Sequence, residues 1–500
     1  MKNANGFDSK SSIASLQPTM ESATIYRKDY KEPVYWIKHV MLDFRIGNGD
    51  KIVIASVLTV QRNTNYSPGS INNNNADLIL DGNANVLRLT HISILHDAND
   101  DEKRILESGT EYVLSDEELC IKSKVFSSLW GNDITGTGTT TTAPMTTMRI
   151  RIVVELSSES LDKRELSGLY RRHGTIVTHC EPTGFRRIAY FLDRPDNTAV
   201  FDVRIEANKS RYPILLSNGN RIEAGDIIDD DDDDDDDDNQ SSSSSQRHFV
   251  RYHDPHPKPC YIFALVAARN LARVNDTHTT GSGRHVDLHI YSEPENIPRL
   301  SFAMETLKKS MAWEEHTYGL EYDLNVYNIV AVQHFVLGAM ENKGLNIFQT
   351  SLIATDPQCT TDITYDLVEK TIAHEYFHNW SGNRVTVRDW FEFALKEGLT
   401  VYRDQEFTSD VGLRTVTRIE AVKILREKQF HEDASEGRHA VRPEHADATR
   451  EHELDALASS TTYHKGAEVS AFVCVFLFFF SSSSSSSSSS HFFLIHWLGS

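Results

Sequence analysis

The sequence predicts a multidomain protein in which an N-terminal all-β, sandwich-like domain precedes a mixed α/β domain. Apolar and polar residues alternate along Met148–Leu156 and Phe201–Glu206, which is typical of half-buried strands. From about Leu271 the pattern changes. The alternating segment His285–Ile290 and the apolar segment Val326–Val332 predict two further strands, and long helical segments follow them.

The domain boundaries follow from these changes of pattern. We expect the N-terminal β domain to span residues 26–270 and the α/β domain to span residues 271–469. Residues 1–25 are polar, and we expect them to be disordered. Residues 229–246 form a low-complexity insertion with ten consecutive aspartates, and like charges repel, so we expect a solvated loop. A calcium site or a basic partner is the alternative for this run.

The last part of the chain, residues 470–500, is an atypical low-complexity tail. Two apolar segments flank ten serines at 481–490, and each segment is too short to span a bilayer. We interpret this tail as a non-native end, such as a mis-predicted exon or a frameshift, which leaves the α/β domain incomplete at its C-terminal end. Exposed apolar segments favour aggregation, so we expect the 500-residue chain to be poorly soluble and nearly inactive.

Composition excludes several kinds of partner. The net charge is −21, and removing the ten consecutive aspartates leaves −11, an acidic balance that disfavours nucleic acid and anionic membranes. Five widely spaced cysteines without a C-x-x-C pair indicate a reducing compartment. The N-terminus has no apolar secretory core, and no apolar stretch reaches 18 residues. We therefore expect a cytoplasmic monomer with no nucleic-acid or membrane partner.

The segment His374-Glu-Tyr-Phe-His378 carries the strongest chemical signal. Helical residues four apart lie on one face, so both imidazoles can reach one Zn²⁺. Glu397 follows after an 18-residue gap and completes a site of two histidines and one glutamate. Glu375, between the histidines, is the candidate general base. The structural alternative is a pair of helical histidines that neighbouring carbonyls satisfy.

Upstream lies Gly338-Ala-Met-Glu-Asn342, in a predicted edge strand. This G-A-M-E-N segment, H-E-x-x-H and the later glutamate together resemble the gluzincin aminopeptidases, in particular the bacterial-type aminopeptidase N branch. The likeness runs from about Tyr26 to about Val469 and includes Cys180–Ile188 and Leu395–Val401. It implies a thermolysin-like zinc metallopeptidase domain after the β domain, with one Zn²⁺ per chain.

The resemblance also implies roles for further residues. Zn²⁺ would be held by His374, His378 and Glu397, and peptides with a free N-terminus would be the substrates. Glu341 and Glu181 would bind the substrate amine, and Tyr463 would stabilise the oxyanion, with a core tyrosine as the structural alternative. His464 departs from the family, where glutamate is usual. The rest of the substrate-binding segment would be Gly338, Ala339, Met340 and Asn342.

Three alternative functions remain open at this point. A thermolysin-like endopeptidase shares the zinc helix but has no need of G-A-M-E-N, and an epoxide hydrolase of the superfamily would have Gly in place of Ala339. A catalytically impaired fragment or a non-catalytic binding protein is the third. The preferred N-terminal residue also stays open, because four residues before Gly338 depart from the branch: Gln333, His334, Val336 and Leu337.

Overall fold

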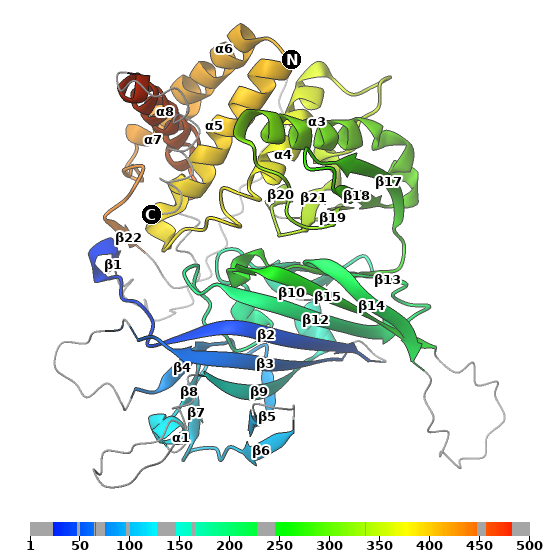
Figure 1. Cartoon of the computed structure of the whole chain (residues 1–500), viewed down its shortest axis with the longest axis vertical. Helices are drawn as coiled ribbons and strands as arrows, with labels where there is room; N and C mark the ends of the chain where they lie inside the picture. The colour runs from blue at the N-terminus through cyan, green and yellow to red at the C-terminus, as the bar shows by residue number, and fades with distance from the viewer. Residues whose placement is uncertain are drawn as a thin grey trace, which may run out of the picture.

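The computed structural model describes residues 24–47, 51–64, 66, 76–96, 101–127, 147–162, 166–227, 246–335, 337–447 and 457–482. The aspartate run, Val336 and nearly all of the N-terminal segment lie outside these residues, as does the tail beyond Ser482. A β-rich part and an α/β part lie one above the other in Figure 1. The predicted order of an all-β domain followed by an α/β domain is confirmed.

The β-rich part is built on an eight-stranded sheet with the order β14-β15-β12-β2-β3-β9-β5-β6. Its strands are β2 (Tyr35–Ile46), β3 (Ile52–Arg62), β5 (Arg88–Leu95), β6 (Glu102–Ile105), β9 (Thr147–Leu156), β12 (Ala199–Asn208), β14 (Asn220–Ile227) and β15 (Arg247–Lys258). Buried and half-buried residues alternate along the whole of β9 and β12. The alternation that predicted these two strands is therefore confirmed.

Two smaller sheets complete the sandwich. One has the order β10-β11-β16-β13 and the other β4-β8-β7. Their strands are β4 (Leu78–Asp81), β7 (Tyr112–Leu114), β8 (Glu118–Ile121), β10 (Gly168–Arg172), β11 (Thr175–His179), β13 (Ile214–Ser217) and β16 (Leu265–Ala268), and the short helices are α1 (Ser123–Ser127) and α2 (Ser158–Leu161). A single cluster of buried side chains joins both smaller sheets to the large one.

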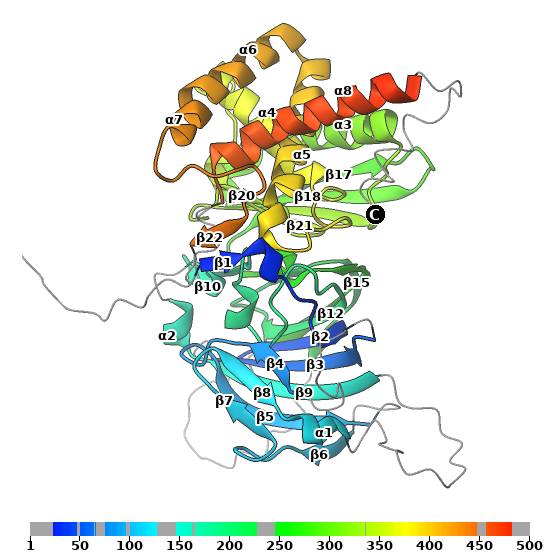
Figure 2. The same ribbon diagram turned by 90° about the vertical axis from the view of Figure 1, so that its left-hand side faces the viewer.

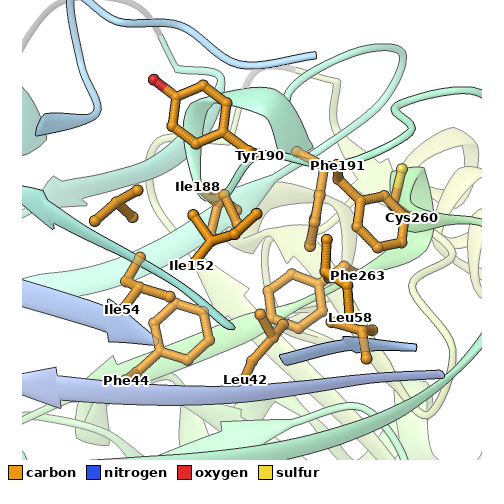
Figure 3. Close-up of a cluster of buried hydrophobic side chains, with 14 of the residues drawn as sticks. Leu42, Phe44, Ile54, Leu58, Ile152, Ile188, Tyr190, Phe191, Cys260 and Phe263 are labelled. Atoms are coloured by element: carbon orange, nitrogen blue, oxygen red, sulfur yellow. The ribbon is translucent and has the colours of Figure 1, made fainter. Parts of the chain in front are cut away.

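The loop after β11 is anchored in this core (Figure 3). The Phe185 ring packs edge-on against Phe191 at 5.0 Å and against Phe263 at 5.3 Å. Ile188 and Tyr190 of the same loop are fully buried. Glu181 lies near the start of this loop, just after β11, so the buried aromatic residues fix the backbone that follows Glu181.

The α/β part contains a five-stranded sheet with the order β17-β18-β19-β21-β20. Its elements are β17 (Ala272–Thr279), β18 (His285–Ser292), β19 (Val326–Val332), β20 (Ala339–Met340), β21 (Leu345–Gln349), α3 (Ser301–Tyr318), α4 (Asp362–Phe377), α5 (Phe393–Val411), α6 (Arg414–Ile424), α7 (Phe430–Asp433) and α8 (Gly466–Ser482). Helices α3 and α6 lie on the side of this sheet away from the β-rich part, and α5 runs from there towards the β-rich part (Figures 1 and 2). Buried residues of α3 and α4 join those of β18 and β19 in one core.

A third apolar cluster holds the two parts together. Tyr261, which follows β15, packs against Trp390 at a ring distance of 5.0 Å, and its hydroxyl donates to the Gly382 carbonyl oxygen at 3.1 Å. Val177 of β11 and Met340 of β20 belong to the same cluster. The strand that ends just before Glu181 is thus packed beside the strand that precedes Glu341.

Both predicted boundary segments contain regular structure where they are described. Thr24 and Ile25 are paired rather than disordered, because β1 (Thr24–Tyr26) forms a two-stranded sheet with β22 (His445–Asp447). The predicted low-complexity tail begins inside α8, which continues past Val469 to Ser482. Its backbone is helical because α8 packs on α5, where Gly398 and Gly466 meet. A Cβ on Gly398 would lie only 2.7 Å from the Gly466 carbonyl carbon.

Across the described residues, no helix combines the length and the hydropathy that crossing a membrane requires.

Candidate metal and substrate site

Helix α4 presents both histidines of the H-E-x-x-H segment. It begins behind Thr361, whose hydroxyl accepts a hydrogen bond from the Thr364 N–H at 3.3 Å. It ends at Phe377, but His378 keeps right-handed helical angles of φ −58° and ψ −17°. The two imidazoles therefore keep helical spacing, and their Nε2 atoms lie 3.0 Å apart. The prediction that these two residues face one point is confirmed.

Glu397 on α5 brings a third ligand atom to the same point. Its Oε2 lies 3.3 Å from Nε2 of His374 and 3.3 Å from Nε2 of His378. Ligand atoms placed about 2.0–2.2 Å from a tetrahedral Zn²⁺ lie roughly 3.3 Å from one another. Two imidazole nitrogens and one carboxylate oxygen at this spacing fit Zn²⁺ and leave one coordination position open.

The other ring nitrogens are held by neighbours, as metal-binding histidines require. Nδ1 of His374 lies 2.8 Å from Oδ2 of Asp404, and Nδ1 of His378 lies 2.8 Å from the Ser381 carbonyl oxygen. Burial alone lowers the pKa of His374, but the hydrogen bonds with Asp404 and Glu397 raise it to about 10. The surroundings therefore favour a positive charge at this point.

Glu375 lies beside the candidate ligands but is not one of the three converging groups. Its side chain is buried, and among the described residues its Oε2 has no hydrogen-bond partner. Burial raises the pKa of Glu375 well above its usual range, and the charges of Glu341 and Glu397 add to this against the opposing effect of His374. A carboxylate that favours the protonated form this strongly is suited to accept a proton.

Three carboxylates surround the ammonium of Lys396, which is fully buried. Its Nζ lies 2.9 Å from Oε1 of Glu181 and 2.6 Å from Oε1 of Glu397, and it also contacts Oε1 of Glu341. Burial lowers the pKa of Lys396, but the three carboxylates raise it well above its usual range. The structure thus brings together the predicted residues Glu181 and Glu341, from different domains, beside a predicted metal ligand.

The pKa values of these carboxylates differ. Burial raises the pKa of Glu181 to about 8, although the charge of Lys396 opposes the rise. Burial also acts to raise the pKa of Glu341, but the Lys396 charge outweighs it and holds that pKa below its usual value. Glu341 is therefore the carboxylate of the pair that keeps a negative charge at neutral pH.

The single edge strand predicted over residues 338–348 is instead a hairpin: β20 holds Ala339 and Met340 at the edge, Glu341 and Asn342 follow it, and β21 lies inside the sheet. β20 pairs only with β21, where Ala339 faces Phe348 and Met340 faces Ile347. Gly338 has a φ of +85°, and a Cβ at this position would lie 2.9 Å from Cδ1 of Leu352, so the turn into the strand requires glycine. Asn342 is fully buried, and neither polar atom of its side chain has a hydrogen-bond partner among the described residues.

Tyr463 lies next to this cluster. It belongs to a π-helical turn, Thr461–Lys465, just before α8, and its ring packs edge-on against Phe393 at 5.9 Å. Burial raises the pKa of its hydroxyl well above the usual value, and the charge of Glu397 contributes in the same direction. The close contact of Gly398 with Gly466 brings this turn to the part of α5 that carries Glu397.

Sequence reasoning missed two residues of the site. Lys396 precedes Glu397 directly, but no local pattern shows that three carboxylates converge on it. Asp404 lies seven residues beyond Glu397 and therefore two helical turns along the same face of α5. That spacing was a usable signal for the partner of His374.

The fold and the site define a class of protein, the metallopeptidases that combine an H-E-x-x-H helix with a glutamate from the next helix. The chain belongs to the peptidase M1 family. Residues 71–238 match the Peptidase M1 N-terminal domain, and residues 302–478 match the Peptidase family M1 domain. The second match continues beyond Val469, where the sequence alone placed the end of the likeness.

Several bacterial aminopeptidases N have sequences similar to this chain. The chain is 42% identical to aminopeptidase N of Haemophilus influenzae over 444 residues, which cover 89% of this chain and 44% of the relative. It is 48% identical to aminopeptidase N of Escherichia coli over 320 residues, or 64% of this chain and 34% of the relative. The solved structure of Legionella pneumophila aminopeptidase A matches with a TM-score of 0.72 and 30% identity, over 91% of this chain and 45% of that one. The chain spans less than half the length of each of these relatives.

Proposed function

We propose that this chain carries the active site of a zinc-dependent aminopeptidase, which removes the N-terminal residue from peptides. The observation that carries this proposal is the meeting of Glu181 and Glu341 with the candidate metal ligand Glu397 around one buried point. An exopeptidase must bind a free α-amine next to the carbonyl that it attacks. Carboxylates beside a metal site satisfy both requirements.

Each residue then has a defined task. His374, His378 and Glu397 would hold Zn²⁺, which when bound would supply a Lewis acid that polarises the substrate carbonyl and lowers the pKa of water. Glu375 takes a proton from the attacking water and passes it to the leaving amine. Its burial supports this role, because a desolvated carboxylate binds a proton more readily than an exposed one.

Substrate binding would use the edge strand and the carboxylates. Glu341 keeps its charge and would pair with the substrate ammonium, with Glu181 completing the anchor from the β-rich part. The backbone edge of Gly338, Ala339 and Met340 can pair with an extended peptide, since among the described residues β20 has a strand on one side only. Asn342 would orient this segment, and the Tyr463 hydroxyl would donate to the developing oxyanion.

The remaining parts of the proposal concern partners and location. We propose peptides as the substrates and a cytoplasmic monomer as the form of the protein. All five cysteines are free, which supports a reducing compartment. An endopeptidase, an epoxide hydrolase and a catalytically impaired or non-catalytic protein of the same family are distinguishable outcomes of the experiments below.

The first prediction is that the purified chain binds about one Zn²⁺, because three protein ligands and one open position define a single catalytic site. Elemental analysis of dialysed protein measures this ratio. His378→Ala should lose the metal, whereas His285→Ala, on an exposed strand position, should keep it. Folded wild-type protein that takes up no zinc would exclude the assignment of these ligands.

The second prediction concerns the free amine. The 500-residue chain should hydrolyse aminoacyl reporter substrates at a low but measurable rate, in keeping with the weak activity expected of it, and should not hydrolyse their N-acetylated forms. Glu341→Ala should raise KM by roughly tenfold or more and lower kcat as well, because a misplaced amine also misplaces the carbonyl. Steady-state kinetics test this, with Glu305→Ala on the exposed face of α3 as the matched control.

Equal cleavage of acetylated and free substrates would favour an endopeptidase. Hydrolysis of an epoxide substrate without aminopeptidase activity would favour the epoxide hydrolase. Zinc binding without any turnover would favour the non-catalytic protein.

A further inference from the structure

A second charged cluster lies behind the site, centred on Asp323. This residue follows α3 and precedes β19, and only 10% of its side chain is exposed. Its Oδ1 accepts from Nζ of Lys343, and its Oδ2 accepts from the Arg384 guanidinium. Neither cation belongs to the candidate active site, so this cluster requires a separate explanation.

Lys343 connects the cluster to β20 and the Glu341 that follows it, which together are called the amine-binding strand. It stands two residues after Glu341, and only 1% of its side chain is exposed. Its Nζ also donates to Oδ1 of Asn379 at 2.8 Å. Asn379 directly follows the candidate metal ligand His378. One ammonium group thus joins the segment that carries Glu341 to the end of the metal-binding helix.

The turn after α4 is tied to the same two places. Arg384 reaches Asp323 from this turn, and the Arg384 N–H donates to the Asn379 carbonyl oxygen at 3.0 Å. Asn383, the residue before it, donates from its side chain to the Glu341 carbonyl oxygen at 2.9 Å, and its N–H donates to the His378 carbonyl oxygen at 3.0 Å. The position of this turn therefore affects both Glu341 and His378.

The β-rich part also contacts Asp323. Nε2 of His256, on β15, lies 3.2 Å from the Asp323 carbonyl oxygen and 3.7 Å from its Oδ2. The side-chain amide of Asn218, between β13 and β14, donates to the Lys343 carbonyl oxygen at 2.8 Å. Asp323 therefore lies where the amine-binding strand, the metal-binding helix and the β-rich part meet.

We propose that Asp323 is a positioning residue, which holds the amine-binding Glu341 in register with the metal ligand His378 through Lys343 and the turn at Asn379–Arg384. The inference rests on the proposed aminopeptidase function. In this role Asp323 would set the distance between the bound substrate ammonium and the scissile carbonyl. An error of about 1 Å in such a distance lowers the rate by as much as a hundredfold.

Among the described residues, Asp323 is the carboxylate that pairs with both Lys343 and Arg384. The charge of Asp254 also acts on Lys343, but Asp254 lies 3.0 Å from Nζ of the buried Lys258. Burial lowers the pKa of Lys343, and Asp323 is the main group that opposes this effect. Without Asp323 the buried ammonium has lost its carboxylate partner and must move or lose its proton.

The test is the isosteric variant Asp323→Asn, compared with Asp276→Asn, which removes a partly exposed carboxylate paired with Lys308. With the free-amine reporter, Asp323→Asn should raise KM by roughly tenfold and leave the zinc content unchanged. Asp276→Asn should change neither KM nor the zinc content. A merely structural residue would lower the amount of folded enzyme and leave KM unchanged. Asp323→Glu, which keeps the charge, should recover most of the wild-type KM.

Lys343→Met removes the same link from its other end and serves where Asp323→Asn does not fold. Combined in one chain, the two substitutions should raise KM no further than either alone. Independent increases that multiply in the double variant would overturn the proposal, as would an unchanged KM in both single variants.

A readout without turnover separates this inference from the proposed function. Amide hydrogen exchange over residues 338–349 should be at least tenfold faster in Asp323→Asn than in wild type or in Asp276→Asn. If wild type cleaves no aminoacyl reporter, the proposed function fails while the exchange result still decides the positioning role. Unchanged exchange in this segment would exclude that role.

Discussion

Glu375→Gln should keep the zinc and lose at least roughly a hundredfold in kcat, since a positioned general base contributes about 10²- to 10⁴-fold to a rate. The substitution is isosteric and removes only the capacity to accept a proton. Glu375 is not one of the three groups whose atoms converge on the metal position, so metal affinity should not change. Steady-state kinetics and elemental analysis of one preparation measure both quantities.

Glu369→Gln is the matched control for this prediction. Glu369 lies on the same helix, its pKa is also raised by burial, and it has no part in the site. Its kcat should stay within about twofold of wild type, because such substitutions away from a site have small effects. Retained activity in Glu375→Gln would assign the proton transfer to another residue, and lost zinc would make Glu375 a ligand.

The sequence predicted the features of this protein that depend on local patterns. The alternation of apolar and polar residues along Met148–Leu156 predicted a strand, because successive side chains of a strand point to opposite faces. The four-residue spacing of His374 and His378 predicted that both side chains lie on one face of a helix, because four residues make about one helical turn. The sequence also predicted Glu397 as the third ligand, and the structure places its carboxylate at the same point as both histidines.

Features that depend on long-range contacts could not be predicted in this way. Pairing of Thr24–Tyr26 with His445–Asp447 joins the start of the described chain to a segment far along the sequence, and neither segment alone differs from a loop. The helix through Ser482 depends on a glycine contact between α5 and α8 that only the folded chain reveals. The same holds for Lys396, whose three partners come from Glu181, Glu341 and Glu397 on different elements.

Lys396→Met should destabilise the protein strongly, by at least about 3 kcal/mol at pH 8, because breaking a buried ion pair from one side leaves uncompensated charge. Methionine is unbranched and one atom shorter than lysine, so it fills most of the same space beside the Phe393 ring, over which Nζ of Lys396 lies at 5.1 Å. The substitution therefore removes the charge with little loss of packing. Denaturant unfolding of the metal-depleted protein, prepared with a chelator, measures the free energy of unfolding.

The pH dependence of this loss identifies its cause. Lys396 is the charge that most lowers the pKa values of Glu341 and Glu397 in the folded state, so its removal raises both. A carboxylate with a raised folded pKa destabilises the protein as pH rises from the unfolded value, about 4.5, through the folded one. The penalty in Lys396→Met should thus be larger at pH 8 than at pH 5, whereas Lys308→Met, at a partly exposed pair with Asp276, should show a small loss at both. An equal penalty at the two pH values would mean that lost packing, and not the three carboxylates, accounts for the effect.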